Sequence, residues 1–124
     1  MYELTVSGHF DAAHYLKDYI GKCAHIHGHR WQVEAKIRGH ALDQKGMLVD
    51  FSLIKKKLRE ITDNLDHCLL NDLVRYKETN PTAENIARFI YQDLEASLKE
   101  YEVTVHQVTV WESPVAAAAY FEEQ

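Results

Sequence analysis

Three histidines in the first quarter of the chain have the type and spacing of metal ligands. His27 and His29 are separated by one residue, in the segment Cys-Ala-His-Ile-His-Gly-His. Side chains alternate along a β-strand, so both imidazoles would point to the same face and can bind one ion. Two imidazoles rarely complete a site, and His14 is the best candidate for a third ligand. Three imidazoles favour Zn2+ or a related first-row ion and leave one coordination position open for chemistry.

Cys23 precedes this pair by four residues. It is either a fourth metal ligand or a reactive thiol that stands beside the ion. A lone cysteine is most often a small buried hydrophobe. Next to a divalent cation, however, the positive charge favours the thiolate, which makes Cys23 a candidate general base or nucleophile. The sequence leaves the choice between ligand and base open.

Four further polar residues are candidates for binding or proton transfer. Asp66 and His67 are adjacent, and a carboxylate beside an imidazole can act as a proton-relay pair, although such residues often only cap a helix. Glu112 follows a valine-rich segment. An inward carboxylate there would bind a guanidine-like edge through two hydrogen bonds, whereas the simpler interpretation is an exposed strand end. Thr82 precedes a helical pattern and is expected to cap it.

Length and composition limit the class of protein. The chain has 124 residues, a formal net charge of -5 and two cysteines. This length suits a single domain over residues 1–124. The charge argues against nucleic acid as the main partner, and the lack of a long apolar run argues against a membrane span. Two unpaired cysteines without a signal peptide indicate the reducing cytoplasm.

The hydrophobic pattern predicts the elements that position these residues. Residues 2–14 and 27–38 alternate between apolar and polar side chains, as half-buried strands do, with the three histidines on the buried faces. Residues 51–63 and 83–98 have apolar side chains at spacings of three and four, which is typical of helices with one buried face. Asp50 and Thr82 are the expected N-caps.

The C-terminal part of the chain returns to strand patterns. Residues 103–112 and 116–122 are expected as strands, with a bulge near His106 and Gln107 because the parity of the valines changes there. Residues 65–72 are expected as an ordered connection.

The order strand, strand, helix, helix, strand, strand predicts an α+β domain. Its sheet would have four antiparallel strands, with both helices on one face. Four strands cannot close a barrel, because small closed barrels need about eight. Pairing of the two open edges between copies of the chain would hide them, so we expect a homo-oligomer.

Five short motifs resemble, in order and spacing, those of the 6-pyruvoyltetrahydropterin synthase superfamily. They are Phe10-Asp-Ala-Ala-His14, Cys23-x-x-x-His27-Gly-His29, Leu65-Asp-His67, Pro81-Thr-Ala-Glu-Asn85 and Val110-Trp-Glu112. Together they cover nearly the whole chain. The short spacing between Cys23 and the histidine pair is similar to that of the bacterial 6-carboxytetrahydropterin synthases of the queuosine pathway. Animal members have a longer insertion there, and a folate-pathway branch has glutamate in place of the cysteine.

The resemblance implies a fold, a cofactor and a reaction. The family has the tunnelling fold, in which trimers close a barrel and two trimers stack into a homo-hexamer. The implied enzyme is a lyase that uses Zn2+, held by His14, His27 and His29, as a Lewis acid. It converts 7,8-dihydroneopterin triphosphate into 6-carboxy-5,6,7,8-tetrahydropterin, acetaldehyde and triphosphate.

The resemblance also implies residue roles. Cys23 would be the thiolate that removes a carbon-bound proton, and Asp66 and His67 would form a proton relay that reaches the thiol across a subunit boundary. Glu112 would anchor the 2-amino and ring N–H edge of the pterin, with a contribution from Thr82.

Two alternatives stay open. One is formation of 6-pyruvoyltetrahydropterin from the same substrate, by elimination of triphosphate alone. The other is a non-catalytic zinc-binding module, which would leave the cysteine, the relay pair and the glutamate without a role. The sequence assigns no role to His25, and Lys17, Lys22 and Arg30 are only candidate cations for the triphosphate.

Overall fold

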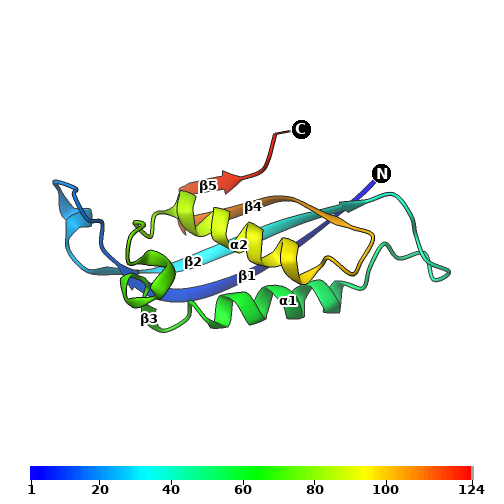
Figure 1. Cartoon of the computed structure of the whole chain (residues 1–124), viewed down its shortest axis with the longest axis horizontal. Coiled ribbons are helices and arrows are strands. Elements are labelled where there is room, and N and C mark those ends of the chain that lie inside the picture. The colour runs from blue at the N-terminus through cyan, green and yellow to red at the C-terminus, as the bar shows by residue number, and fades with distance from the viewer. Residues whose placement is uncertain (124) are drawn as a thin grey trace.

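Two long antiparallel strands form the centre of the fold (Figure 1). In the computed structural model, which describes residues 1–123, β1 (Tyr2–His14) pairs with β2 (His27–Gly39) along its whole length. The register runs from Tyr2 opposite Gly39 to His14 opposite His27. Alternate residues of both strands are buried, as the sequence pattern predicted. The register therefore brings the predicted ligands together at one end of the sheet.

The sheet has five strands, in the order β3-β1-β2-β4-β5. β4 (Thr104–Ser113) pairs antiparallel with β2 and with β5 (Ala116–Tyr120). The additional strand is β3 (Cys68–Leu69), which pairs parallel with β1. The prediction of four antiparallel strands was therefore wrong, because two residues are too few to show an alternating pattern.

The predicted bulge is present in β4. Lys36 lies opposite Gln107, but the next residue, Ile37, lies opposite Val105, so His106 is the extra residue. An extra residue reverses the side-chain parity of a strand. Val105 and Val108 consequently both face the core, although they are three positions apart and would lie on opposite faces of a regular strand.

Two capped helices pack against the sheet. α1 (Phe51–Asp63) begins after Asp50, whose carboxylate accepts a hydrogen bond from the backbone N–H of Ser52 at 2.8 Å. α2 (Ala83–Ser97) begins after Thr82, whose hydroxyl accepts from the N–H of Asn85 at 3.1 Å. Such caps satisfy N–H groups that the helix itself leaves unpaired. Both predicted caps are confirmed.

A single hydrophobic cluster joins both helices to the inner face of the sheet. α1 packs against β1, and α2 packs against β4 and β5. Trp31 is fully buried at the end of this cluster that adjoins the histidines, and its ring stacks on Phe10 with centroids 5.8 Å apart. The Trp31 indole N–H donates to the Ala12 carbonyl oxygen at 3.2 Å. The indole N–H is therefore satisfied, and the ring of Trp31 packs against the rings of His14 and His29.

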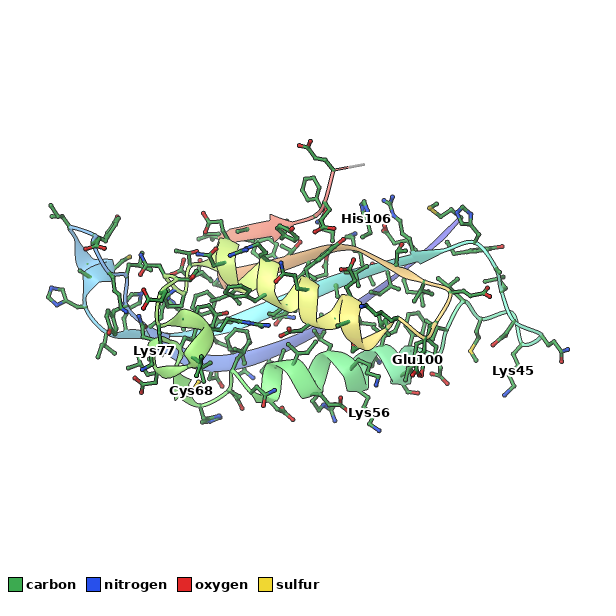
Figure 2. The ribbon with its side chains drawn as sticks, in the orientation of Figure 1. Lys45, Lys56, Cys68, Lys77, Glu100 and His106 are labelled. Carbon is green, nitrogen blue, oxygen red and sulfur yellow. The ribbon has the colours of Figure 1, made fainter. Side chains whose placement is uncertain are left out.

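Charged side chains cover the outside of the molecule. Figure 2 shows Lys56 projecting from α1 and Lys45 from the loop before it. On the sheet, the Arg38 guanidinium donates to the Glu3 carboxylate at 2.8 Å. Within residues 1–123, no helix has the length and apolar character needed to cross a membrane.

Candidate active site

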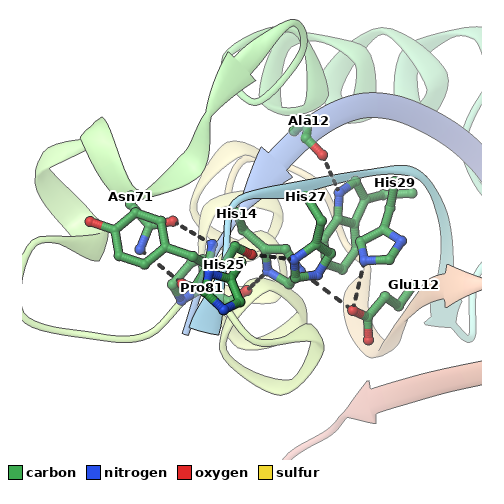
Figure 3. Close-up of polar contacts among 10 residues, drawn as sticks. Ala12, His14, His25, His27, His29, Asn71, Pro81 and Glu112 are labelled. Carbon is green, nitrogen blue, oxygen red and sulfur yellow. Dashed lines mark hydrogen bonds and ion pairs between the residues drawn. The ribbon is translucent and has the colours of Figure 1, made fainter. Parts of the chain in front are cut away.

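The three predicted metal ligands lie together at one end of the sheet (Figure 3). His14 ends β1, His27 begins β2 directly opposite it, and His29 follows on the same face. The ring centroid of His14 lies 4.5 Å from that of His27 and 5.3 Å from that of His29. The His27 and His29 centroids are 4.8 Å apart. Strand parity and the β1–β2 register are therefore sufficient to gather all three rings.

Hydrogen bonds to carbonyl groups fix two of the rings. His14 Nδ1 lies 2.7 Å from the Pro81 carbonyl oxygen, and His27 Nδ1 lies 2.7 Å from that of His25. A carbonyl oxygen only accepts, so Nδ1 carries the proton in both rings. In each neutral ring Nε2 then offers a lone pair, as metal-binding histidines require.

The free nitrogen atoms of this cluster fit a cation. Nε2 of His14 and Nε2 of His29 are buried and have no hydrogen-bond partner within residues 1–123. Buried polar atoms are rarely left unpaired, because the loss of hydration is not compensated. A first-row divalent cation would satisfy both nitrogen atoms at once. The arrangement is therefore that of a metal-binding cluster.

Burial tunes the two inner histidines toward the metal-binding form. It lowers the pKa of His14, with a partly opposing effect from the hydrogen bond to the Pro81 carbonyl. Burial also lowers the pKa of His29, against the attraction of the Glu112 carboxylate. A lower pKa favours the neutral imidazole, which is the form that binds a metal ion.

Glu112 joins the three histidines in one group of possible ligands. Its Oε1 atom lies 3.0 Å from His29 Nε2 and 3.4 Å from His14 Nε2. The four ligand atoms all lie within 4.8 Å of one another. The residue before it, Trp111, pairs with Gln32, which puts Glu112 next to the histidine strand. The sequence left open whether this carboxylate points inward or lies at an exposed strand end. It did not predict the contact with the histidines, because that depends on the register of β2 against β4.

Cys23 lies in the loop between β1 and β2. It is half-buried in a short 3-10 helix, Lys22–Ala24, and its carbonyl oxygen accepts a hydrogen bond from the Leu16 N–H at 2.7 Å. Within residues 1–123, the group of donors around the histidines does not include its sulfur. The choice between fourth ligand and reactive thiol therefore stays a prediction.

Two asparagines, which sequence reasoning missed, hold the beginning of this loop. Asn71 is buried; its side chain accepts from the N–H of Tyr15 and donates to the Tyr15 carbonyl oxygen, both at 3.0 Å (Figure 3). Asn80 does the same for Lys17, at 2.8 and 3.0 Å. Each side-chain amide thus makes the two backbone hydrogen bonds that a neighbouring strand would otherwise make. The partners lie more than fifty residues apart in sequence, so no local pattern indicates them.

Asp66 and His67 form the expected pair. His67 Nδ1 lies 2.8 Å from Asp66 Oδ2, while Asp66 Oδ1 accepts from the backbone N–H of Asp11 at 2.8 Å. These hydrogen bonds, that from Asp11 first, lower the pKa of Asp66. The side chain of His67 is 78% exposed. It lines a shallow hollow of about 410 Å³ together with His29.

Thr82 has a structural contact of its own, because its hydroxyl caps α2. The carbonyl group just before it, that of Pro81, orients His14.

Among the candidate cations for a phosphate, Lys17 donates through Nζ to the Lys77 carbonyl oxygen, and Arg30 Nε lies 3.9 Å from Asp11. The structure therefore leaves Arg30 the freer of these two.

A second hollow of about 640 Å³ opens beside the cluster. Its walls come from the adjoining ends of β2 and β4 and include His29, Arg30, Trp111 and Glu112. Most of this lining is apolar, with a carboxylate and a guanidinium as its charged groups. Flat heteroaromatic ligands bind in such places, where apolar walls surround a few polar groups.

The comparison with protein families decides the relationship. Residues 3–123 match the family model described as 6-pyruvoyl tetrahydropterin synthase. The chain belongs to this family. The resemblance drawn from the five sequence motifs is thereby confirmed.

Relatives within the 6-pyruvoyl tetrahydropterin synthase family cover nearly the whole chain. A protein of Bacillus subtilis named 6-carboxy-5,6,7,8-tetrahydropterin synthase is 36% identical over 96% of this chain and 84% of its own length. A protein of the same name from Synechocystis is 37% identical over 90% of this chain and 87% of its own. The structure of 6-pyruvoyl tetrahydropterin synthase from Caenorhabditis elegans has a TM-score of 0.87 at 27% identity, covering 98% of this chain and 96% of that one.

Proposed function

We propose that this protein is a 6-carboxytetrahydropterin synthase. It would convert 7,8-dihydroneopterin triphosphate into 6-carboxy-5,6,7,8-tetrahydropterin, acetaldehyde and triphosphate, as a step of queuosine biosynthesis in the cytoplasm. The names of relatives at 36% and 37% identity support this assignment. The observation that carries it is the cluster of three imidazoles and one carboxylate beside an apolar hollow.

His14, His27 and His29 would hold Zn2+, which when bound supplies a Lewis acid for the oxygen atoms of the substrate side chain. Glu112 would bind the 2-amino and ring N–H edge of the pterin through its two carboxylate oxygen atoms. The hollow next to Glu112 supports this role, because it is wide and mostly apolar. Thr82 would contribute mainly by fixing the start of α2.

Cys23 would act as the general base. Cys23 lies in the loop that joins His14 to His27, and the described group of possible ligands does not include its sulfur, which supports proton abstraction rather than metal binding. The Asp66 and His67 pair would complete the proton relay. Because the His67 side chain is largely exposed in one copy of the chain, we propose that the relay serves a neighbouring copy in a homo-hexamer, a dimer of trimers.

Identification of the products tests the proposed reaction. Purified protein with Zn2+ and 7,8-dihydroneopterin triphosphate should release acetaldehyde in proportion to triphosphate. An alcohol dehydrogenase assay measures the aldehyde. Triphosphate release without acetaldehyde would instead indicate 6-pyruvoyltetrahydropterin formation, the activity named for the similar Caenorhabditis elegans structure.

Substitution of Cys23 separates the enzyme from a non-catalytic zinc module. Cys23→Ala should keep one metal ion per chain and lose turnover by at least about a hundredfold, since it removes the base but not a ligand. Cys68→Ala, at the other half-buried cysteine, is the matched control and should keep both. Loss of metal in Cys23→Ala would show that the thiol is a ligand.

A further inference from the structure

We propose that Asn71 and Asn80 are positioning residues for the reaction. Their side-chain amides fix the backbone of the residues on either side of Leu16, and the N–H group of Leu16 in turn holds Cys23. The placement of Cys23 depends only on the geometry of the loop. Its effect on turnover rests on the proposed function, in which Cys23 is the general base.

Hydrogen bonds, rather than burial, hold the loop that carries Cys23. The loop joins β1 to β2, and residues 15–26 are all at least partly exposed. Ile20, near its tip, is fully exposed. A segment with so little buried apolar surface gains little stabilisation from the hydrophobic effect. The position of Cys23 therefore depends on the polar contacts that the loop makes with the rest of the chain.

Each asparagine pairs with both backbone groups of one loop residue. Asn71 accepts from the Tyr15 N–H and donates to the Tyr15 carbonyl oxygen, both at 3.0 Å. Asn80 makes the same two bonds with Lys17, at 2.8 and 3.0 Å. Hydrogen bonds are directional, so a pair of them fixes the orientation of the backbone better than one bond does. Tyr15 and Lys17 are two positions apart, as residues that pair along one edge of an extended chain are.

Leu16 lies between these two residues and has a different partner. Successive residues of an extended chain direct their N–H groups to opposite edges. The Leu16 N–H is accordingly available on the edge away from the asparagines, and it donates to the Cys23 carbonyl oxygen at 2.7 Å. This bond closes the loop at the short 3-10 helix Lys22–Ala24. Fixing both neighbours of Leu16 therefore fixes the direction from which Cys23 is held.

Both asparagines are themselves attached to the packed part of the molecule. Asn71 is only 3% exposed and follows Leu70, which is fully buried. The Asn80 carbonyl oxygen accepts from Asn85 Nδ2 at 3.0 Å and from the Thr82 N–H at 2.9 Å, which attaches Asn80 to the start of α2. The order of the core thus reaches an exposed loop through side-chain amides.

A general base depends strongly on its position. The sulfur of Cys23 has to come within hydrogen-bond reach of the proton that it removes. A misplacement of about 1 Å can cost about a hundredfold in rate. Because Leu16 holds the backbone of Cys23 itself, rotation or detachment of residues 15–17 displaces the thiol. The asparagines would thus affect the chemical step without touching the substrate.

Kinetics of asparagine variants test the effect on turnover. Asn80→Ala should lower kcat at least about tenfold, with KM and metal content as in wild type, because it displaces the base and removes no ligand. Asn80→Asp keeps the acceptor for the Lys17 N–H and should recover part of the lost kcat. Asn71→Ala should behave like Asn80→Ala, and the partly exposed Asn80 keeps the test independent of folding at the buried site. A raised KM with unchanged kcat would indicate substrate binding and overturn the proposal.

Ile54→Val is the matched control for a general loss of stability. Ile54 is fully buried in the first turn of α1, which begins at the opposite end of the molecule from the loop (Figure 1). Removal of a buried methyl group destabilises the fold but leaves the contacts of the loop in place. Well below the melting temperature, its kcat should equal that of wild type. Equal losses of kcat in Ile54→Val and Asn80→Ala would overturn the positioning role.

Amide exchange gives a measurement that needs no substrate. Hydrogen–deuterium exchange, read by mass spectrometry at the Leu16 amide, should be at least about tenfold faster in Asn80→Ala than in wild type, whereas that of Val33 in β2 should not change. Unchanged exchange at Leu16 would overturn the proposal. If Leu16 exchanges faster in the variant but the wild-type protein forms no acetaldehyde, the proposed function fails while the placement of Cys23 by the asparagines stands.

Discussion

His14 connects three parts of the molecule through one side chain. It ends β1, receives its orientation from the carbonyl group that precedes α2, and directs Nε2 toward His29 and Glu112. The position of His14 on the buried face could be predicted from parity alone. Its bond to Pro81 could not, because the two residues are 67 positions apart and only tertiary packing brings them together.

Replacement of His14 should abolish metal-linked stability. A ligand that binds only the folded chain adds about 2.7 kcal/mol when present at one hundred times its dissociation constant. Chelation should therefore lower the Tm of the wild-type protein by several degrees and leave that of His14→Ala unchanged. His9→Ala, at an exposed histidine of the same strand, should respond to the chelator as wild type does. A chelator effect that persists in His14→Ala would exclude His14 from the site.

Among the elements, the long ones could be predicted and the short one could not. β1, β2, α1 and α2 each repeat their side-chain pattern over many residues, so the sequence indicates them directly. β3 is a strand only because the N–H and carbonyl groups of β1 lie beside it. The contact between Glu112 and the histidines was missed for the same reason, since it follows from the pairing of two strands distant in sequence.

The buried amide of Asn71 should be essential to the element that it holds. Asn71→Ala leaves the backbone N–H and carbonyl of Tyr15 without partners and should reduce the free energy of unfolding by about 1–3 kcal/mol. Asn64→Ala, at an exposed asparagine with a single bond to the Glu60 carbonyl, should cost less than about 1 kcal/mol. Urea denaturation measures both, and equal losses would contradict the structural role of Asn71.

The hydrogen bonds of Asp66, in the turn before β3, should make the stability of the protein depend on pH. The pKa of Asp66 is lowered from its ordinary value of 3.8, so the folded state binds the proton less well than the unfolded chain. The stabilisation that ionised Asp66 provides is therefore complete above the ordinary pKa of 3.8. It is lost as the pH falls through the lower pKa of the folded state. Wild type and Asp66→Asn should differ in unfolding free energy near neutral pH and converge in acid. Asp63→Asn, near the end of α1, is the control, and a difference independent of pH would contradict this assignment.

At the scale of the whole molecule, the sheet ends in two edges and the relay pair faces outward. Co-expression of Cys23→Ala with His67→Ala tests whether one active site uses residues from two copies. Random assembly should restore about one quarter of wild-type turnover, because a site then needs an intact cysteine from one chain and an intact histidine from another. Co-expression of Cys23→Ala with the double variant Cys23→Ala/His67→Ala should restore none. Absence of activity in both mixtures would place cysteine and histidine of one site in the same chain.

The weak attachment of the segment between β1 and β2 should cause the protein to lose activity on heating before it unfolds. Two amide side chains, at Asn71 and Asn80, hold the start of this segment, and its tip includes the fully exposed Ile20. Segments with few buried contacts detach in sub-global fluctuations while the rest of a fold stays intact. Cys23 travels with this segment, so the temperature of half-inactivation is expected to lie below that at which the sheet melts.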